Sequence, residues 1–216
     1  SYSIIIFFSF YSHRLCSQVI DSKLLELGER IFSSGQYLID REYGLHPITF
    51  KEDQIDTVFI AVHGYRSRGY EWVHALKKMT ESKNKTYFYR WDWSQCPEEA
   101  GSILHANIEK LLDSNPQIQH INIFGHSYGA SIVTEIGDKP ELGSVDIHSI
   151  AGALVPMKRL KKRCPDFIGY KDIKLSYRHF QWRTVKQQDG AFKRMDFDPQ
   201  LVDISGSSVI NLPPVF

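Results

Sequence analysis

Runs of apolar residues alternate with amphipathic stretches along most of this 216-residue chain. Apolar or aromatic runs of strand length predict buried strands, which cover residues 57–62, 86–91, 121–124, 145–150, 180–186 and 207–212. Apolar positions at helical spacing predict helices, which cover residues 18–32, 70–82, 98–113 and 130–137. Strands that alternate with helices over so many units indicate an α/β fold, with a mostly parallel central sheet and helices on both faces.

The first 54 residues depart from this alternation. Residues 1–11 are strongly apolar, about as long as the core of a signal peptide and too short to span a bilayer. We interpret residues 1–16 either as the remnant of a secretory or membrane-targeting signal, or as a buried strand or translation artefact. The chain is accordingly expected to be secreted, membrane-associated or cytoplasmic. Residues 17–54 are expected to form a helix, Gln18–Phe32, that ends at Ser33-Ser34-Gly35, followed by a lead-in to the main domain.

The charge balance excludes some partners. Lysine and arginine total 26 and aspartate and glutamate total 25, so the net charge exerts no general attraction for nucleic acid, and no nucleic-acid partner is expected. The segment Met157–Arg163 is a local exception because it is strongly basic. It is interpreted as a solvated helix face or, alternatively, as a basic lid that holds an anionic acyl substrate or makes peripheral contact with acidic lipid.

Three cysteines, Cys16, Cys96 and Cys164, are too few to form a disulfide framework. We expect them to be free and partly buried, although Cys96 and Cys164 could pair in an exported protein. No group of His and Cys residues has the spacing of zinc ligands, so no metal and no cofactor is expected.

The segment Gly125-His126-Ser127-Tyr128-Gly129 joins the predicted strand 121–124 to a helix-permissive run. A G-x-S-x-G sequence between a strand and a helix is typical of a nucleophile elbow, in which a strained turn exposes the serine hydroxyl above the sheet. The two glycines allow neighbouring backbone to pass where a β-carbon would clash. Ser127 is therefore the candidate nucleophile.

With this elbow, the chain resembles the α/β-hydrolase superfamily over residues 55 to 212, and most of all its small lipase-like and esterase-like members. The resemblance rests on His63-Gly64-Tyr65, Trp91-Asp92-Trp93-Ser94, the elbow around Ser127, and Asp189-Gly190. It implies an α/β-hydrolase domain over residues 55–216, which we expect to be truncated at its C-terminus.

The resemblance also implies roles for individual residues. The backbone N–H groups of Tyr65 and Tyr128 would form the oxyanion hole, and Asp189 would be the acid of the catalytic triad. The alternatives are an ordinary turn at His63-Gly64 and a solvated carboxylate at Asp189. Asp146, Asp166 and Asp172 are weaker candidates for the acid.

The histidine of the triad is missing from the expected place, since no histidine follows His179. Three explanations are open: the chain stops short of the base, His179 substitutes for it, or the protein is not catalytic. We favour the first, because Leu212-Pro213-Pro214 resembles a strand exit that leads into a histidine loop. His126 is expected to point away from Ser127.

The sequence thus predicts a serine hydrolase that acts on a small-molecule ester or lipid through an acyl-enzyme. The alternative function is a catalytically inactive binding or scaffold protein with the same fold. Trp93, near a strand exit, is the aromatic residue expected to line a substrate pocket.

Overall fold

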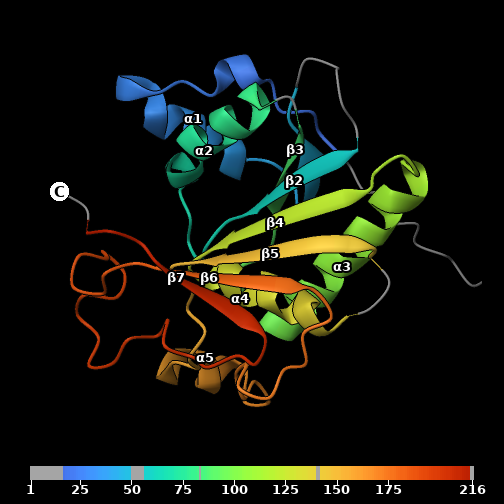
Figure 1. Ribbon diagram of the computed structural model, residues 1–216. Helices are drawn as coiled ribbons and strands as arrows, with labels where there is room; N and C mark the ends of the chain where they lie inside the picture. The colour runs from blue at the N-terminus through green and yellow to red at the C-terminus, as the bar shows by residue number, and fades with distance from the viewer. Residues whose placement is uncertain (1–16, 50–55, 83, 140–141, 215–216) are drawn as a thin grey trace, which may run out of the picture.

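A computed structural model describes residues 17–49, 56–82, 84–139 and 142–214, which contain one seven-stranded sheet with the strand order β1-β3-β2-β4-β5-β6-β7 (Figure 1). The strands are β1 (Gly44–Pro47), β2 (Thr57–Val62), β3 (Lys85–Arg90), β4 (His120–His126), β5 (Ser144–Ile150), β6 (Arg178–Arg183) and β7 (Ser207–Asn211). Strand β1 pairs antiparallel with β3, and all other pairs are parallel. The predicted α/β class and mostly parallel sheet are confirmed.

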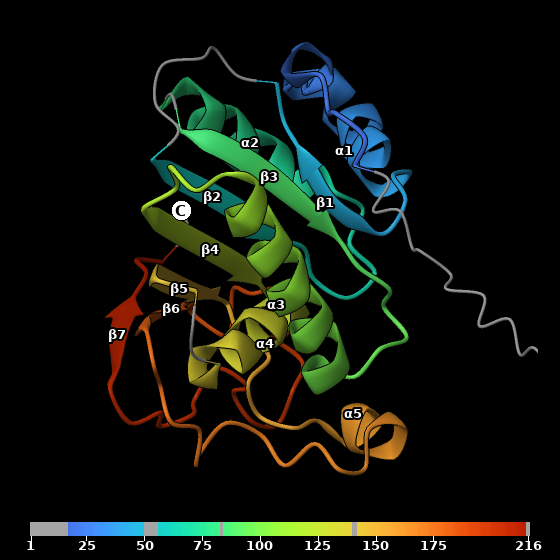
Figure 2. The same cartoon turned by 90° about the vertical axis from the view of Figure 1, so that its right-hand side faces the viewer.

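Helices pack against both faces of the sheet. Helices α1 (Ile31–Ile39) and α2 (Tyr70–Glu81) lie on one face, and α3 (Pro97–Ser114) and α4 (Tyr128–Glu135) lie on the other (Figure 2). The alternation of side chains along β2 explains the two layers, because Val58 and Ile60 belong to the apolar core beside α3 and α4, whereas Ala61 belongs to the core beside α2. A short helix, α5 (Lys158–Arg163), lies beyond α4 in both views.

The predicted helix Gln18–Phe32 is wrong. Ile20 forms an isolated parallel bridge with Ile48, and only short 3₁₀ turns form at Ser22–Leu24 and Gly28–Arg30. Gly28 has a φ of 70°, which interrupts a helix. The helical spacing of apolar residues was therefore outweighed by pairing with a distant part of the chain.

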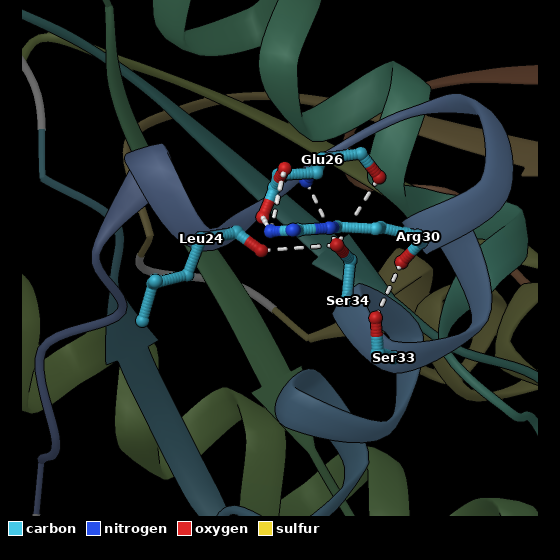
Figure 3. Close-up of polar contacts among 5 residues, drawn as sticks. All are labelled: Leu24, Glu26, Arg30, Ser33 and Ser34. Atoms are coloured by element: carbon cyan, nitrogen blue, oxygen red, sulfur yellow. Dashed lines mark hydrogen bonds and ion pairs between the residues drawn. The ribbon is translucent and has the colours of Figure 1, made fainter.

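Ser33-Ser34-Gly35, expected to end that helix, instead lies inside α1. The Ser34 hydroxyl accepts a hydrogen bond from Glu26 N at 2.7 Å and lies 3.0 Å from Leu24 O, as Figure 3 shows. Arg30 pairs with the Glu26 carboxylate across the same turn at 3.0 Å. The serines thus fasten the preceding turns to α1, which local propensity does not reveal.

The sequence pattern also missed the edge strand β1, which is only four residues long and ends in a proline. Residues 1–16, interpreted as a signal remnant or a buried strand, lie outside the described residues. Among the helices that the structure describes, none combines the length and hydropathy needed to cross a bilayer.

Candidate active site

Ser127 occupies the sharp turn between β4 and α4, with φ 56° and ψ −117°. A positive φ is unusual for a residue with a β-carbon, so the surroundings must hold it in place. Ser127 N donates to Ile150 O at 3.0 Å, and Ser127 O accepts from Ala130 N and Ala153 N, both at 3.1 Å. The backbone of the candidate nucleophile is thus bonded to its own helix and to the neighbouring strand.

The two motif glycines are required by close packing of main chain on main chain. A β-carbon on Gly125 would lie 2.3 Å from Gly129 O, and one on Gly129 would lie 2.4 Å from Val62 O. Separations this short are not tolerated between backbone atoms. The G-x-S-x-G pattern therefore has a steric cause in this fold.

The His63-Gly64-Tyr65 turn lies against Ser127. A β-carbon added to Gly64 would lie 3.1 Å from Ser127 Cβ and 3.6 Å from its Oγ, so the turn passes directly beside the hydroxyl. Tyr128 is the first residue of α4, so its N–H has no partner within the helix and stands at the positive end of the helix dipole. The structure therefore places the Gly64 turn and the N-terminus of α4 beside Ser127, and Tyr65 lines both cavities that Ser127 lines.

His63 is buried and holds this turn in place. Its Nδ1 lies 2.9 Å from Gly64 O, its Nε2 lies 3.4 Å from Trp91 N, and its own carbonyl accepts from Trp91 Nε1 at 2.8 Å. Burial lowers the pKa of His63 to about 3. The ring is therefore neutral at ordinary pH, with Nδ1–H donating to Gly64 and Nε2 accepting from Trp91.

Asp189 lies in the loop that follows β6. Its Oδ1 accepts from Ala191 N at 2.8 Å and Phe192 N at 3.2 Å, and its Oδ2 accepts from Thr184 Oγ1 at 3.1 Å. All these partners belong to its own loop, yet Ala191 and Phe192 line a cavity that contains Ser127. The structure therefore brings the Asp189 loop to the site, while the carboxylate is occupied in shaping that loop.

Asp146, a weaker candidate for the acid, stands near the start of β5, where Arg178 forms a two-pronged ion pair with it. This position is at the opposite end of the parallel strands from Ser127. Asp166 and Asp172 are exposed. None of the three is placed at the candidate site.

The histidines divide into structural residues and one neighbour of the serine. His179 contacts the Thr134 hydroxyl at 3.1 Å through Nε2 and the Ser207 hydroxyl at 2.7 Å through Nδ1, and burial lowers its pKa to about 4. His126 lines a cavity with Ser127, and its pKa is lowered chiefly by burial. Within the part of the chain that the structure describes, no histidine is hydrogen-bonded to Ser127 Oγ.

Two cavities meet at Ser127. The apolar cavity has a volume of about 200 Å³, and its walls come from α5, the Asp189 loop and the elbow. It is lined by Tyr65, Ser127, Tyr128, Ala153, Met157, Leu160, Arg163, Ala191, Phe192 and Met195. The polar cavity, of about 270 Å³, includes Gly64, Ser67, Glu71, His126 and Ser127. Ser127 can therefore be approached by an apolar group from one side and by a polar group from the other.

Several residues of the apolar cavity were not identified from the sequence. Met157 and Leu160 come from the start of α5, and Phe192 and Met195 come from the Asp189 loop; no local pattern reveals that these segments approach Ser127. The basic segment Met157–Arg163 was the only sequence signal for this part of the cavity, because it contains Arg163. Trp93, the expected pocket residue, is not among the residues that line this cavity.

Cys96 and Cys164 form a disulfide, so the expectation of free thiols is wrong for this pair. The Cα atoms are 5.7 Å apart although the residues are 68 positions apart in the sequence. Cys96 immediately precedes α3 and Cys164 immediately follows α5, so the bond attaches the cavity-lining helix α5 to the main body of the fold. Among the described residues, no group of three potential ligands is arranged to hold a metal ion.

Comparison with known proteins agrees with this architecture. No family model and no curated protein sequence matches the chain. Solved structures do: a monoacylglycerol lipase of Paleococcus ferrophilus matches with a TM-score of 0.53 and 13% identity, over 80% of this chain and 89% of that one.

Two other solved structures are similar to a comparable degree. An esterase of Pyrococcus furiosus matches with a TM-score of 0.50 and 12% identity, over 86% of each chain. A poly(3-hydroxybutyrate) depolymerase of Bordetella parapertussis matches with a TM-score of 0.51 and 11% identity, over 79% of this chain and 77% of that one. With its mostly parallel sheet, two helix layers and strand-turn-helix at Ser127, the chain has the α/β-hydrolase fold.

Proposed function

We propose that the protein is a serine hydrolase that cleaves carboxylic esters through an acyl-enzyme. The observation that carries the proposal is the geometry of Ser127, a residue with positive φ whose hydroxyl side lies against Gly64 and opens on two cavities. Small-molecule esters and lipids are the substrate classes, in keeping with the lipase and esterases that share the fold.

In the proposed reaction, Ser127 Oγ attacks the ester carbonyl carbon while a base takes the hydroxyl proton. The negative charge that develops on the carbonyl oxygen is stabilised by the N–H groups of Tyr65 and Tyr128, and the alcohol leaves with the proton. Water then attacks the acyl-enzyme and releases the acid. Donors of this kind are worth about 2.7–4 kcal/mol each in known enzymes.

The proposed reaction also needs a base, and no described side chain is hydrogen-bonded to Ser127 Oγ in that role. The polar cavity provides a route by which a base can reach Ser127 Oγ, because Ser127, Glu71 and His126 line it together. Asp189 is proposed to orient the base, since its loop borders both cavities through Ala191. An imidazole group that reaches Ser127 through the polar cavity would complete the reaction.

The alternative is a non-catalytic binding protein with this fold. It is favoured by one observation, that Ser127 Oγ has no hydrogen-bonded base within residues 17–214 as described.

Labelling with a fluorophosphonate, with and without added imidazole, tests the proposal. We expect the chain to be labelled and to hydrolyse a 4-nitrophenyl ester, and both reactions to become faster when free imidazole supplies the base. Ser127→Ala should abolish labelling and the part of turnover that depends on added imidazole. The matched control is Ser102→Ala, an exposed serine on α3 that should change neither reaction.

Labelling that persists in Ser127→Ala would exclude this serine as the nucleophile. A folded chain that is not labelled under either condition would favour the binding protein.

A further inference from the structure

Arg163 is the only charged residue among those that line the apolar cavity beside Ser127. The other lining residues are apolar or aromatic, apart from the hydroxyl groups of Ser127, Tyr65 and Tyr128. A ligand that fills the cavity therefore meets an apolar surface and one guanidinium group.

The guanidinium is held in a defined position by uncharged groups. Its Nη1 donates to Trp93 O at 2.9 Å, and its Nη2 donates to Gln95 O at 3.4 Å and to Tyr128 Oη at 3.0 Å. It also lies 5.6 Å from the ring centres of both Tyr65 and Tyr128, within cation–π range. Arg163 thus contacts Tyr65 and Tyr128, which line the cavity together with Ser127.

The backbone of Arg163 is held in place by a disulfide at the next residue. It is the last residue of α5, and the next residue, Cys164, is joined to Cys96 at the start of α3. A long side chain anchored at both ends loses little further freedom when it binds a ligand, which favours recognition.

Arg163 is an exposed residue, and its positive charge has no ion-pair partner among the residues that the structure describes. Three of the five N–H donors of an arginine are used here, and all three point to neutral oxygens. No carboxylate of the described chain lies within ion-pair distance of the guanidinium. Asp92 is close enough for Arg163 to contribute to its lowered pKa, but the larger causes are hydrogen bonds from Ser94 N and Oγ, both at 2.8 Å.

We infer that Arg163 is an anion-recognition residue of the active site, and that the preferred substrate is an ester whose short acyl chain ends in a carboxylate. The inference rests on the proposed function, because it places the scissile carbonyl at Ser127. The guanidinium keeps Nε–H and one Nη1–H, which point in different directions, so it would hold a carboxylate oxygen through a single charged hydrogen bond. The cavity volume of about 200 Å³ is below the range of roughly 300–1,000 Å³ typical of drug-sized ligands, which favours a short chain.

Binding to a variant that cannot turn over tests the inference directly. In the Ser127→Ala background, ligand-observed NMR would compare monomethyl adipate, which carries a carboxylate, with dimethyl adipate, which does not. We expect the anionic ester to bind about tenfold to a hundredfold more tightly, the range that a charged hydrogen-bonded pair provides.

Variants at position 163 separate charge from packing. Arg163→Gln should remove the preference for the anionic ester, and Arg163→Lys should retain part of it because the charge remains. Lys161→Gln is the matched control, since it removes the same charge from a position on the same helix that does not line the cavity, and it should leave the preference within about twofold. Thermal unfolding of each variant verifies that the fold is intact.

Equal binding of the two esters, or a preference that survives in folded Arg163→Gln, would overturn the inference. Hydrolysis of 4-nitrophenyl hexanoate and of the 4-nitrophenyl half-ester of adipate distinguishes this failure from failure of the proposed function. Ser127-dependent hydrolysis without preference for the half-ester would overturn the role of Arg163 alone. Anion-selective binding in a chain that fluorophosphonate never labels would support the Arg163 site and overturn the proposed esterase.

Discussion

The two sides of the Ser127 site are built in different ways. On the elbow side, backbone packs on backbone, with Gly125, Gly129 and Gly64 all placed where a side chain would collide with main-chain or Ser127 atoms. On the cavity side, α5 and the Asp189 loop contribute side chains, and a single disulfide attaches α5 to the body of the fold. The contrast indicates that the geometry of Ser127 is set by main-chain packing, whereas the shape of the adjoining cavity is set by side chains.

The largest expected effect is a loss of stability when a glycine is replaced by alanine on the elbow side, compared with the same replacement on the cavity side. Gly129→Ala places a β-carbon 2.4 Å from Val62 O and 2.6 Å from His63 O, and should destabilise the fold by about 3 kcal/mol or more. The melting temperature should fall by about 6–12 °C. Gly190→Ala, in the Asp189 loop, meets nothing within 4 Å and should stay within about 0.5 kcal/mol of the parent. Equal losses in calorimetry would remove the distinction between the two sides.

Removal of the disulfide should have the next largest effect and should act on the cavity side. The double variant Cys96→Ser/Cys164→Ser is expected to lose about 2–4 kcal/mol in urea unfolding, because the unfolded chain is no longer constrained across 68 residues. Added reductant should destabilise the parent by the same amount and leave the variant unchanged. A parent whose stability is insensitive to complete reduction would show that α5 is held by its other contacts.

A smaller and pH-dependent effect is expected on the elbow side, at Glu135 of α4. Burial raises the pKa of this carboxyl from 4.5 to about 7; a hydrogen bond from Tyr170 opposes the rise, and Asp138 and Glu98 reinforce it. Between about pH 4.5 and 7, the unfolded chain releases this proton while the folded chain retains it, so stability falls as the pH rises.

Glu135→Gln should therefore be more stable than the parent above pH 7, by on the order of 2 kcal/mol, and the difference should vanish near pH 4. Urea unfolding across this pH range measures it. Asp113→Asn, which neutralises an exposed carboxylate on α3, serves as the control and should not reproduce the trend. A constant difference at all pH values would assign the effect of Glu135→Gln to packing.

Local patterns in the sequence were sufficient for the central features of the fold. The strand 121–124 and the following helix frame Ser127 in consecutive residues, so apolar runs and two glycines predicted both the element order and the turn. The same holds for β2 and the turn at His63-Gly64, which a continuous apolar run precedes. The positions of Tyr65 and Tyr128 beside Ser127 follow from these neighbours.

Features that depend on distant partners were not predictable in this way. Ile20 pairs with Ile48, and Cys96 meets Cys164, across separations that no periodicity encodes. Arg163 belongs to a run that reads as a solvated basic face, and only the folded chain brings it into the wall of the Ser127 cavity. The roles of Asp189 and of the oxyanion residues stay predictions that labelling and kinetics can test.

The backbone conformation of Ser127 determines which residue fits this turn with the least strain. A φ of 56° with a ψ of −117° is a conformation that glycine adopts readily and serine does not. Glycine at this position would adopt the same backbone conformation with less strain. The serine therefore carries a conformational cost that glycine would not carry, and the backbone hydrogen bonds of Ser127 to Ile150, Ala130 and Ala153 offset it.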